Sequence, residues 1–429
     1  LKARPRGERP DFAASGAGRG GPCSHTPPLK HRAMATGVAA VQALAEQVDA
    51  RLKEADEKKL DVAAVKRVLF GSYAELWNNA EEADDKDALK VLSELRPKLR
   101  IRPLRLGLAS RVFMYVRMVV TLLVASWGAM CIIIVAPVRW LNPLFKACGV
   151  PNGLLPMDLC LTAWALATLS AAGVRIKVEG APAQEVWGRG VYGLIVYNHG
   201  SNLDPFIVSS VCHSQAPKYV GKKTLFKLPF FGWMCLVIGC IPINRGDREK
   251  AVRVMNETVA SIMRRWGRSV AVAPEGTRTT DGHLNLPFKK GTFHTQEQTG
   301  AALLPVVIHG AFELWPPGQL FATTGEVTVR ILPKLALEGD TASREASRLA
   351  LQRRYAKTLA QHTDLSAQPL SVRGVAECLV TFLLSLVVLR LFWGLFWALT
   401  AAAGLSISGI AGLLVLATVV VAVIVDTIF

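Results

Sequence analysis

The apolar residues of this chain are gathered into long uncharged runs near its middle and towards its carboxyl end. Residues 118–138 contain no charged side chain, and a second, shorter uncharged run covers 159–174. Residues 378–425 are uncharged except for Arg390. About 20 helical residues cross a bilayer core, so 118–138 is long enough to span, and 376–429 predicts a pair of transmembrane helices. The run 159–174 is short for a span and also fits half of a hairpin within one leaflet.

Between the apolar runs, short uncharged stretches alternate with stretches of helical spacing, which is clearest over 248–266. Strands that alternate with helices are typical of an α/β layer fold. Residues 177–340 are numerous enough to bury a core of their own, so we expect one α/β domain there. Its predicted strands are 193–197, 237–243, 270–273, 303–308 and 327–332.

Both flanks of this domain contain polar helical segments. Residues 34–100 place apolar side chains at helical spacing among charges of both signs, which predicts two or three cytosolic helices. These helices fit a partner-binding or regulatory arm, and simple packing against the rest of the chain fits them equally well. After the domain, residues 341–375 predict a polar helix and a linker.

Residues 1–33 are rich in Arg, Gly and Pro and show no apolar periodicity, and the first methionine is Met34. We expect this stretch to be a disordered leader or translated untranslated sequence. A plastid transit peptide is the competing interpretation, because the stretch is Arg-rich and poor in acidic residues. Its few Ser and Thr residues and its lack of an amphipathic pattern favour the first interpretation.

The chain is strongly basic, with a formal net charge of +17 at pH 7. Such an excess suggests nucleic acid as a partner, but the basic residues lie beside the apolar runs. Lys and Arg next to a membrane span are typical of a cytoplasmic side that faces anionic lipid. We therefore expect a membrane partner and no nucleic acid, with a basic stretch and a membrane helix pair or hairpin over 101–176. The basic residues before the first run are Arg96, Lys98, Arg100, Arg102, Arg105, Arg111 and Arg117.

Cysteine usage and the order of the apolar runs both bear on the compartment. The eight cysteines show neither the spacing of a zinc site nor a dense disulfide pattern, so free thiols in a reducing compartment are expected. A paired or re-entrant apolar segment before the α/β domain returns the chain to the side of the basic stretch. The domain is therefore expected to face the cytosol.

A candidate site begins at 198–204, which reads Asn-His-Gly-Ser-Asn-Leu-Asp directly after an apolar stretch. A neutral imidazole beside a carboxylate is a ready general base. Residues five apart point to different faces of a helix. The pair therefore requires His199 in a loop and Asp204 about one turn into a helix expected over 202–212. Ser201 and Asp204 also fit a helix capping box, which is the competing interpretation.

Four further clusters follow at the ends of predicted strands, where loops build sites. An arginine side chain is a fork of donors that fits phosphate oxygens. Gly276 would allow the backbone to approach a ligand closely, and Glu275 would hold an arginine or a substrate hydroxyl. A base–acid pair with arginines beside a membrane anchor indicates chemistry on a phosphorylated lipid. The clusters are 221–232 with Lys222, 239–245 with Arg245, 274–278 with Arg278, and 287–291 with Lys289, leading to Pro305.

These motifs resemble the glycerophospholipid acyltransferase family in order and in spacing. Residues 198–204 resemble its first motif, the H-x4-D signature, and 239–245 its second. Glu-Gly-Thr-Arg at 275–278 resembles the third motif, and 304–306 the fourth. The stretches around Lys222 and Lys289 look most like the 1-acylglycerol-3-phosphate acyltransferase branch.

Two positions depart from the pattern of that branch. Pro242-Ile243-Asn244 precedes the arginine of the second motif, where the branch more often has Phe-Ile-Asp. Ala273-Pro274 precedes the third motif in place of Phe-Pro. Both departures concern the identity of the acyl acceptor.

The resemblance implies an α/β acyltransferase core with flanking transmembrane or membrane-embedded α-helices. It implies transfer of a fatty acyl group from acyl-CoA, a co-substrate, to a lysophospholipid hydroxyl, with 1-acyl-sn-glycerol-3-phosphate giving phosphatidic acid. No metal and no further cofactor are implied. His199 would be the catalytic base and Asp204 would orient it. The residues implied to bind substrate are Arg245, Glu275, Gly276, Thr277, Arg278, Lys222, Lys289 and Pro305.

Other functions stay open on the sequence. Within the same chemistry, the alternative acceptors are another lysophospholipid and glycerol-3-phosphate. A base that activates water would make the protein an acyl-CoA thioesterase, and an inactive site would make it a lipid-binding membrane protein. The arginines disfavour hydrolysis, and the complete His–Asp pair disfavours an inactive site. The expected location is the endoplasmic reticulum membrane with a cytosol-facing site, and a plastid membrane is the alternative.

Overall fold

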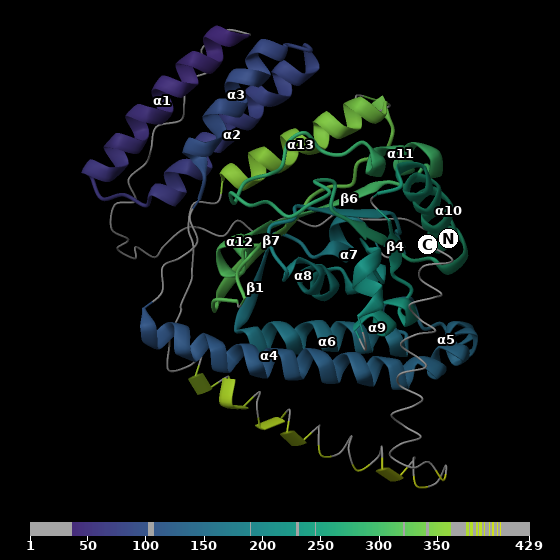
Figure 1. Cartoon of the computed structure of the whole chain (residues 1–429). Coiled ribbons are helices and arrows are strands. Elements are labelled where there is room, and N and C mark those ends of the chain that lie inside the picture. The colour runs from purple at the N-terminus through teal and green to yellow at the C-terminus, as the bar shows by residue number, and fades with distance from the viewer. Residues whose placement is uncertain are drawn as a thin grey trace, which may run out of the picture. The chain divides into compact units, whose positions relative to one another are not determined.

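The structure is a computed structural model, and it arranges helices above and below a central sheet (Figure 1). The residues that it describes are 37–101, 107–188, 190–228, 231–244, 246–320, 322–339 and 343–361, with scattered positions between 375 and 404. The predicted leader over 1–33 and most of the predicted helix pair over 376–429 lie outside these residues.

A seven-stranded sheet forms the centre of the described residues, in the order β1-β7-β6-β2-β5-β3-β4. All neighbours are parallel except β6 and β7. Four-residue β2 lies in the middle and is buried throughout, as expected of a parallel strand covered on both faces. The strands are β1 Val174–Glu179, β2 Leu194–Tyr197, β3 Lys218–Lys222, β4 Ile241–Ile243, β5 Val270–Val272, β6 Leu303–His309 and β7 Gly325–Ile331.

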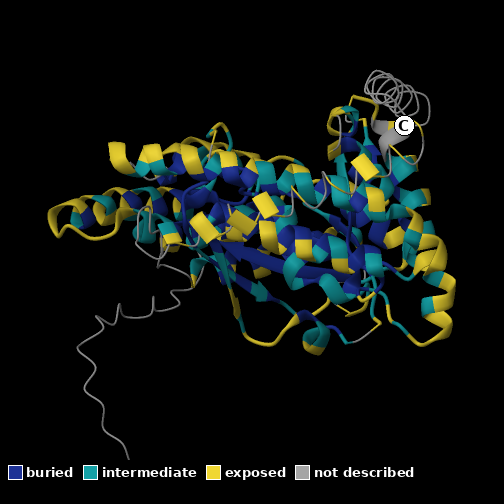
Figure 2. Ribbon diagram, turned by 90° about the horizontal axis from the view of Figure 1, so that it is seen from below, coloured by how far each residue is buried: buried dark blue, intermediate teal, exposed yellow. Residues whose placement is uncertain are grey.

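Helices cover the two faces of the sheet, and the alternation of side chains along β2 decides which cluster each residue joins. Leu194 and Val196 pack in one cluster with residues of the N-terminal helices and α13. Ile195 and Tyr197 pack in the other cluster with α8 and the end of α6. Figure 2 shows this buried layer between more exposed helices. The helices of the α/β region are α6 Pro156–Ala172, α7 Ala183–Val186, α8 Asp204–Val211, α9 Phe231–Val237, α10 Arg248–Trp266, α11 Gly291–Thr299, α12 Ala311–Leu314 and α13 Arg344–Ala360.

The predicted mixture of strands and helices is confirmed, with differences in particular elements. The helix predicted over 248–266 coincides with α10. The single strand predicted over 237–243 is wrong: residues 231–237 are helical, Gly239 turns the chain with φ 84°, and only Ile241–Ile243 is strand. A short uncharged run satisfies a buried helix as well as a strand, so composition did not separate the two. Strands β1 and β3 were not predicted because lysines and an arginine interrupt their apolar pattern.

The N-terminal segment forms α1 Val38–Glu57, α2 Val62–Glu82 and α3 Lys86–Leu99. Asp61 and Asp85 cap α2 and α3, because the carboxylate of Asp61 accepts two backbone N–H groups of the first turn and that of Asp85 accepts one. Helix α2 packs along α13 through a buried polar contact in which Gln352 donates to Asn78 Oδ1 at 2.7 Å. The predicted two or three helices are confirmed, and they form one core cluster with the sheet.

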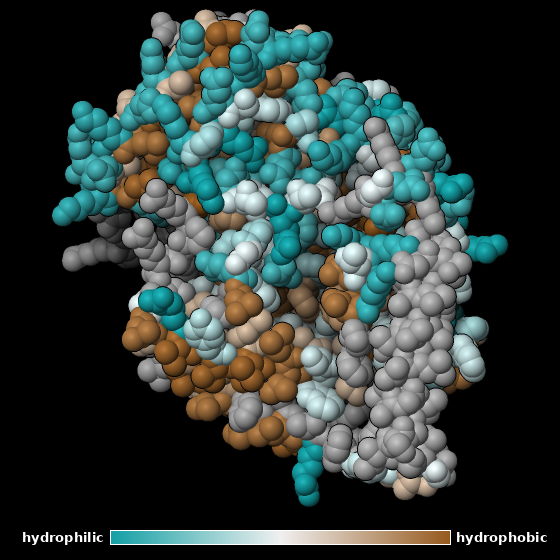
Figure 3. Space-filling model, in the orientation of Figure 1, coloured by the Kyte–Doolittle hydropathy of each residue, from teal (hydrophilic) through white to brown (hydrophobic). Residues whose placement is uncertain are grey.

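The first apolar run forms most of helix α4, Leu108–Val135, which continues through short helical turns to α5 Asn142–Ala147. Among the described residues, Leu108–Ala147 is the one helical stretch long and apolar enough to cross a membrane, and α6 is shorter. Exposed apolar side chains lie on α4 at helical spacing and contribute to an apolar patch (Figure 3). Such patches mark contact with a membrane or a protein. They are Leu108, Val112, Tyr115, Val116, Val119 and Leu122.

Helices α4 and α6 pack closely enough to require glycine at 128. A Cβ there would lie 2.0 Å from Cδ1 of Trp164, whose indole donates to the carbonyl of Ala125 at 2.9 Å. We expect Gly128→Ala to lower the free energy of unfolding by about 1–3 kcal/mol, because the methyl group displaces a packed ring. Thermal unfolding of the purified protein in detergent measures the effect. Gly291→Ala in α11 is the control, since no atom lies within 4 Å of the position that a Cβ would take at residue 291. An unfolding midpoint equal to that of the control would contradict the close packing.

Candidate functional site

The predicted pair lies together at the carboxyl end of the central strand β2. His199 is in the loop after β2, and its Nδ1 lies 2.7 Å from Oδ2 of Asp204. The Asp204 side chain is 1% exposed and the His199 side chain 20% exposed. The pair is therefore buried on the carboxylate side and open on the imidazole side.

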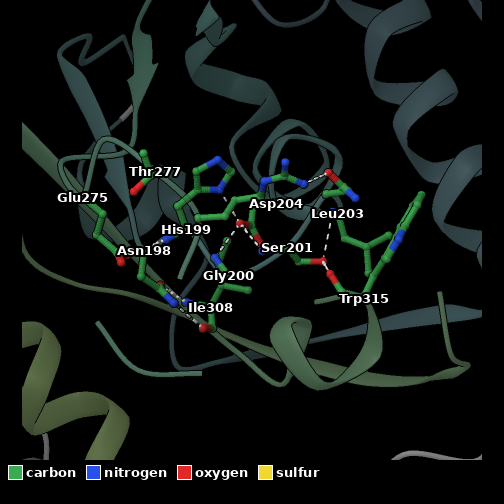
Figure 4. A network of polar contacts seen from close by, with 12 residues as sticks. Asn198, His199, Gly200, Ser201, Leu203, Asp204, Glu275, Thr277, Ile308 and Trp315 are labelled. Atoms are coloured by element: carbon green, nitrogen blue, oxygen red, sulfur yellow. Dashed lines mark hydrogen bonds and ion pairs between the residues drawn. The ribbon is translucent and has the colours of Figure 1, made fainter. Parts of the chain in front are cut away.

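One carboxylate oxygen of Asp204 binds three consecutive residues of the loop, 199–201, as Figure 4 shows. Oδ2 of Asp204 also accepts the backbone N–H groups of Gly200 and Ser201, both at 2.9 Å. A carboxylate that accepts from Nδ1–H leaves Nε2 of the imidazole without a proton. The geometry thus provides a nitrogen that accepts a proton from a group bound at the exposed edge of His199.

Two details differ from the sequence interpretation. Asp204 is the first residue of α8 and not one turn into it, because Pro205 follows it at a position where helices begin. Ser201 does not cap that helix by the capping-box contact. Its hydroxyl accepts from the N–H of Leu203 at 3.2 Å and donates to the carbonyl of Trp315 at 2.9 Å. Ser201 therefore fixes the loop to the segment after α12.

Glu275 is a brace inside the fold and not an exposed group. It is 2% exposed, and its two oxygens accept the N–H of His199 at 2.6 Å and the N–H of Asn285 at 2.8 Å. Burial raises the pKa of Glu275 to about 8, against the opposing effect of these hydrogen bonds. In this geometry Glu275 ties the loop of His199 to the loop of Asn285.

The rest of the third motif forms a turn beside the pair. Gly276 has φ 74°, a conformation that favours glycine, and its Cβ position would lie 3.0 Å from Cγ of Lys289. The guanidinium of Arg278 donates to the side-chain oxygen of Asn202. Thr277 lies near His199 in the close view (Figure 4). The turn at 275–278 and the His199 loop therefore lie next to each other and form one edge of the candidate site, which we call the rim.

The remaining predicted residues occupy different surroundings. Lys222 ends β3 and is exposed, as is Lys289. Pro305 is buried within β6, opposite Val196 of β2, so it packs inside the sheet that carries the site. Arg245 lies outside the described residues.

A side chain inside the first motif, Asn198, has a structural task that was not predicted. Its amide donates to the carbonyl of Ile308 at 2.8 Å and accepts the N–H of Ile308 at 2.7 Å. This pair of bonds continues the contact between β2 and β6 beyond the end of β2. An amide side chain directly after a buried strand is the signal in the sequence for such a role.

Two of the basic residues expected to face lipid bind polar groups of the fold instead; Arg117 is buried and Arg96 is partly buried. Arg117 is 1% exposed and its Nε donates to the carbonyl of Ala171 at 2.9 Å. Arg96 lies against Asp281 at 2.7 Å. Both satisfy polar groups within the fold, which a count of charges along the chain does not reveal.

A small cavity of about 50 Å³ lies beside the pair, lined by residues from α2, α12, α13 and the loops. This volume admits a few water molecules and no lipid. A lipid substrate would therefore have to approach His199 from its exposed edge. The lining includes Arg67, Phe70, His199, Asp204, Glu275 and Glu313.

Comparison with known proteins identifies the region around this site. Residues 175–309 match the family described as Acyltransferase. The chain is 31% identical over 170 residues to the 1-acyl-sn-glycerol-3-phosphate acyltransferase of Saccharomyces cerevisiae, which covers 39% of this chain and 54% of that protein. It is 34% identical over 124 residues to 1-acyl-sn-glycerol-3-phosphate acyltransferase BAT2, chloroplastic, of Brassica napus, covering 29% and 35%.

A solved structure is also similar. It is the crystal structure of the 1-acyl-sn-glycerophosphate acyltransferase PlsC from Thermotoga maritima, with a TM-score of 0.43 and 22% identity over 57% of this chain and 97% of that chain. The aligned part of this chain spans about half of the yeast protein and about a third of the Brassica protein.

The raised pKa of Glu275 makes stability depend on pH in a stated direction. In the folded protein the carboxyl keeps its proton up to about pH 8, whereas the unfolded chain releases it near the ordinary value of 4.5. Deprotonation between these values therefore favours the unfolded state. We expect the stability advantage of the wild type over Glu275→Gln to be largest near pH 5, to shrink up to about pH 8 and to change little above. Thermal midpoints of both proteins between pH 5 and 9 measure this, and a constant or growing difference would refute it.

Proposed function

We propose that this chain transfers a fatty acyl group from acyl-CoA to the free hydroxyl of a lysophospholipid, and the match of residues 175–309 to the family described as Acyltransferase supports this proposal. The acceptor that we propose first is 1-acyl-sn-glycerol-3-phosphate, which would give phosphatidic acid. The observation that carries the proposal is the 2.7 Å contact between Nδ1 of His199 and Oδ2 of Asp204. This contact occupies Nδ1, so that Nε2 of the imidazole is the nitrogen that acts as the base.

In the proposed reaction, Nε2 of His199 takes the proton of the acceptor hydroxyl as its oxygen attacks the thioester carbonyl. Asp204 stabilises the imidazolium that forms. Collapse of the tetrahedral intermediate breaks the carbon–sulfur bond, and the imidazolium returns the proton to the CoA thiolate. The thioester is already activated, so no serine or cysteine nucleophile is required.

The N–H groups of Gly200 and Ser201 are bound to Asp204, so they do not face the oxyanion of the intermediate. We assign them to holding the carboxylate. The N–H of Leu203 does not face the oxyanion either, because it is bound to the hydroxyl of Ser201.

We propose that Arg278 and Arg245 bind the acceptor phosphate, with Thr277 at the glycerol. Arg278 supports this because it lies on the same rim as the His199 loop through its contact with Asn202. Lys222 and Lys289 are exposed and are assigned to phosphates of the acceptor or of CoA. Gly276 and Glu275 shape the turn and the loop.

We propose that the protein acts at a membrane. The apolar helix Leu108–Ala147 and the exposed apolar side chains of α4 support this, because a lysophospholipid resides in the bilayer while acyl-CoA arrives from water. The endoplasmic reticulum, with the site towards the cytosol, is the proposed location. A plastid membrane is the alternative.

We expect His199→Ala to abolish acyl transfer. We expect Asp204→Asn to lower kcat at least about 100-fold, because its amide N–H opposes Nδ1–H and reverses the tautomer of the imidazole. The assay incubates membranes containing the full chain with labelled acyl-CoA and a panel of lysophospholipids and identifies the labelled product. His213→Ala is the control, since the His213 ring hydrogen-bonds the carbonyl of Ser210 and not the His199–Asp204 pair.

The same assay separates the competing functions. Labelled fatty acid without labelled lipid would identify a thioesterase, and no turnover at all would identify a lipid-binding protein. Retention of acyl transfer by purified His199→Ala would refute the assignment of the base.

We expect Arg278→Ala to raise the KM for a phosphate-bearing acceptor about tenfold or more and to leave the KM for acyl-CoA within about threefold. Arg265→Ala, an exposed arginine on α10, is the control. Initial rates with 1-acylglycerol-3-phosphate and with a 1-acylglycerol lacking the phosphate measure the effect. Equal changes for both acceptors would argue against phosphate binding by Arg278.

A further inference from the structure

We propose that Arg96 of α3 is a positioning residue for His199, so that the N-terminal helices complete the candidate active site. The inference deepens the proposed function, on which it rests. It also assigns a role to residues 38–99, for which the sequence left partner binding, regulation and packing open.

Arg96 binds the segment 275–285 at several points. Its Nε donates to Oδ2 of Asp281 at 2.7 Å and its Nη2 to Oδ1 at 3.3 Å, a two-pronged contact. Nη2 also donates to the carbonyl of Leu284 at 3.0 Å and to the side-chain oxygen of Asn285 at 3.3 Å. The Arg96 side chain is 21% exposed and that of Asp281 15%, so solvent screens the pair only in part.

The segment that Arg96 holds binds both backbone polar groups of His199. The N–H of His199 donates to Glu275 at 2.6 Å, and the carbonyl of His199 accepts the N–H of Thr279 at 2.8 Å. Glu275 in turn accepts the N–H of Asn285 at 2.8 Å. The Thr279 hydroxyl donates to Asp281 at 2.7 Å. Arg96 therefore reaches each of the two residues that bind the His199 backbone through one intermediate residue. Asp281 connects it to Thr279, and Asn285 connects it to Glu275.

Other contacts attach the N-terminal helices to the same segment. The N–H of Ile101 donates to the carbonyl of Asp281 at 2.9 Å. The ring of Phe70 on α2 stacks on His283 with centroids 4.2 Å apart, and Nε2 of His283 lies 2.8 Å from the carbonyl of Leu99. These contacts place the segment against α2 and the end of α3, so Arg96 acts within a formed interface.

The placement has a kinetic consequence. A general base must lie within hydrogen-bond reach of the proton that it takes, and small displacements of reacting groups lower rates strongly. Loss of Arg96 releases the segment that positions His199 and that also carries Thr277 and Arg278, whereas Lys222 and Lys289 lie outside it. The effect should therefore fall on kcat and on the KM for the acceptor, and not on the KM for acyl-CoA.

The experiment compares Arg96→Ala and Arg96→Lys with Lys98→Ala in the full-length protein in membranes. Lys98 is the matched control, because it lies on the same helix and makes an exposed ion pair with Asp49 at 2.8 Å, away from the segment. We expect Arg96→Ala to lower kcat about tenfold or more, with the KM for acyl-CoA within about threefold. Arg96→Lys should recover part of the rate, since a lysine keeps the charge but not the fork. Lys98→Ala should match the wild type.

Amide hydrogen exchange gives a readout that does not need turnover. We expect faster exchange at His199 and Asn285 in Arg96→Ala and wild-type exchange in Lys98→Ala, because these two amides donate to Glu275. If Arg96→Ala does not fold, Arg96→Lys carries the test through an intermediate loss of kcat and an intermediate rise in exchange.

Unchanged exchange at both amides, or a kcat equal to that of Lys98→Ala despite a lower unfolding midpoint, would overturn the proposal and leave Arg96 a structural residue. Absence of acyl transfer in the wild type would instead refute the proposed function. The exchange result would still decide whether Arg96 positions the loop.

Discussion

The loop that carries His199 is organised around one buried oxygen atom. Oδ2 of Asp204 receives the imidazole and two backbone N–H groups, which offsets the cost of burying a carboxylate. Because three donors must converge on one atom, residues 199–201 have to curl over the first turn of α8. This constraint explains why the imidazole meets the carboxylate only through a loop. It also explains why the N–H groups at the start of the helix serve the carboxylate and leave the proposed oxyanion to other donors.

A second carboxyl group lies next to the first in a different environment. Glu275 receives only backbone N–H groups, and burial raises its pKa to about 8, with the nearby charge of Asp204 adding to the rise. Two carboxyl groups in one site thus have separate tasks, because they make contact with different groups. Asp204 faces the imidazole, whereas Glu275 holds the backbone of the same histidine. The proposed chemistry therefore depends on a brace that does not itself touch the reacting atoms.

The features that could be predicted from sequence are those encoded by near neighbours. Residues close together in the chain determine the contact of His199 with Asp204 and the helix over 248–266, so both could be predicted. The contacts that hold the His199 backbone could not be predicted, because the partners are far apart in the chain. Glu275 binds His199 across 76 residues, and Arg96 binds Asp281 across 185 residues. A charged residue in a basic stretch has the same local sequence pattern whether it faces lipid or a partly buried carboxylate such as that of Asp281. Only the packing of α3 on the segment 275–285 separates these two states.

The N-terminal helices reach the candidate site by a second route that runs through α13. Arg348 of α13 binds Glu81 of α2 at 2.8 Å, and Gln352 binds Asn78 in a buried contact. One turn further along α13, the hydroxyl of Tyr355 donates to the carbonyl of Val196 at 2.5 Å. Val196 lies in β2, directly ahead of the His199 loop. Helix α3 therefore contacts the loops around His199, while α2 supports the strand that carries it. Because one route ends at the loop that carries His199 and the other at the strand that precedes this loop, the N-terminal helices are part of the architecture that positions the base.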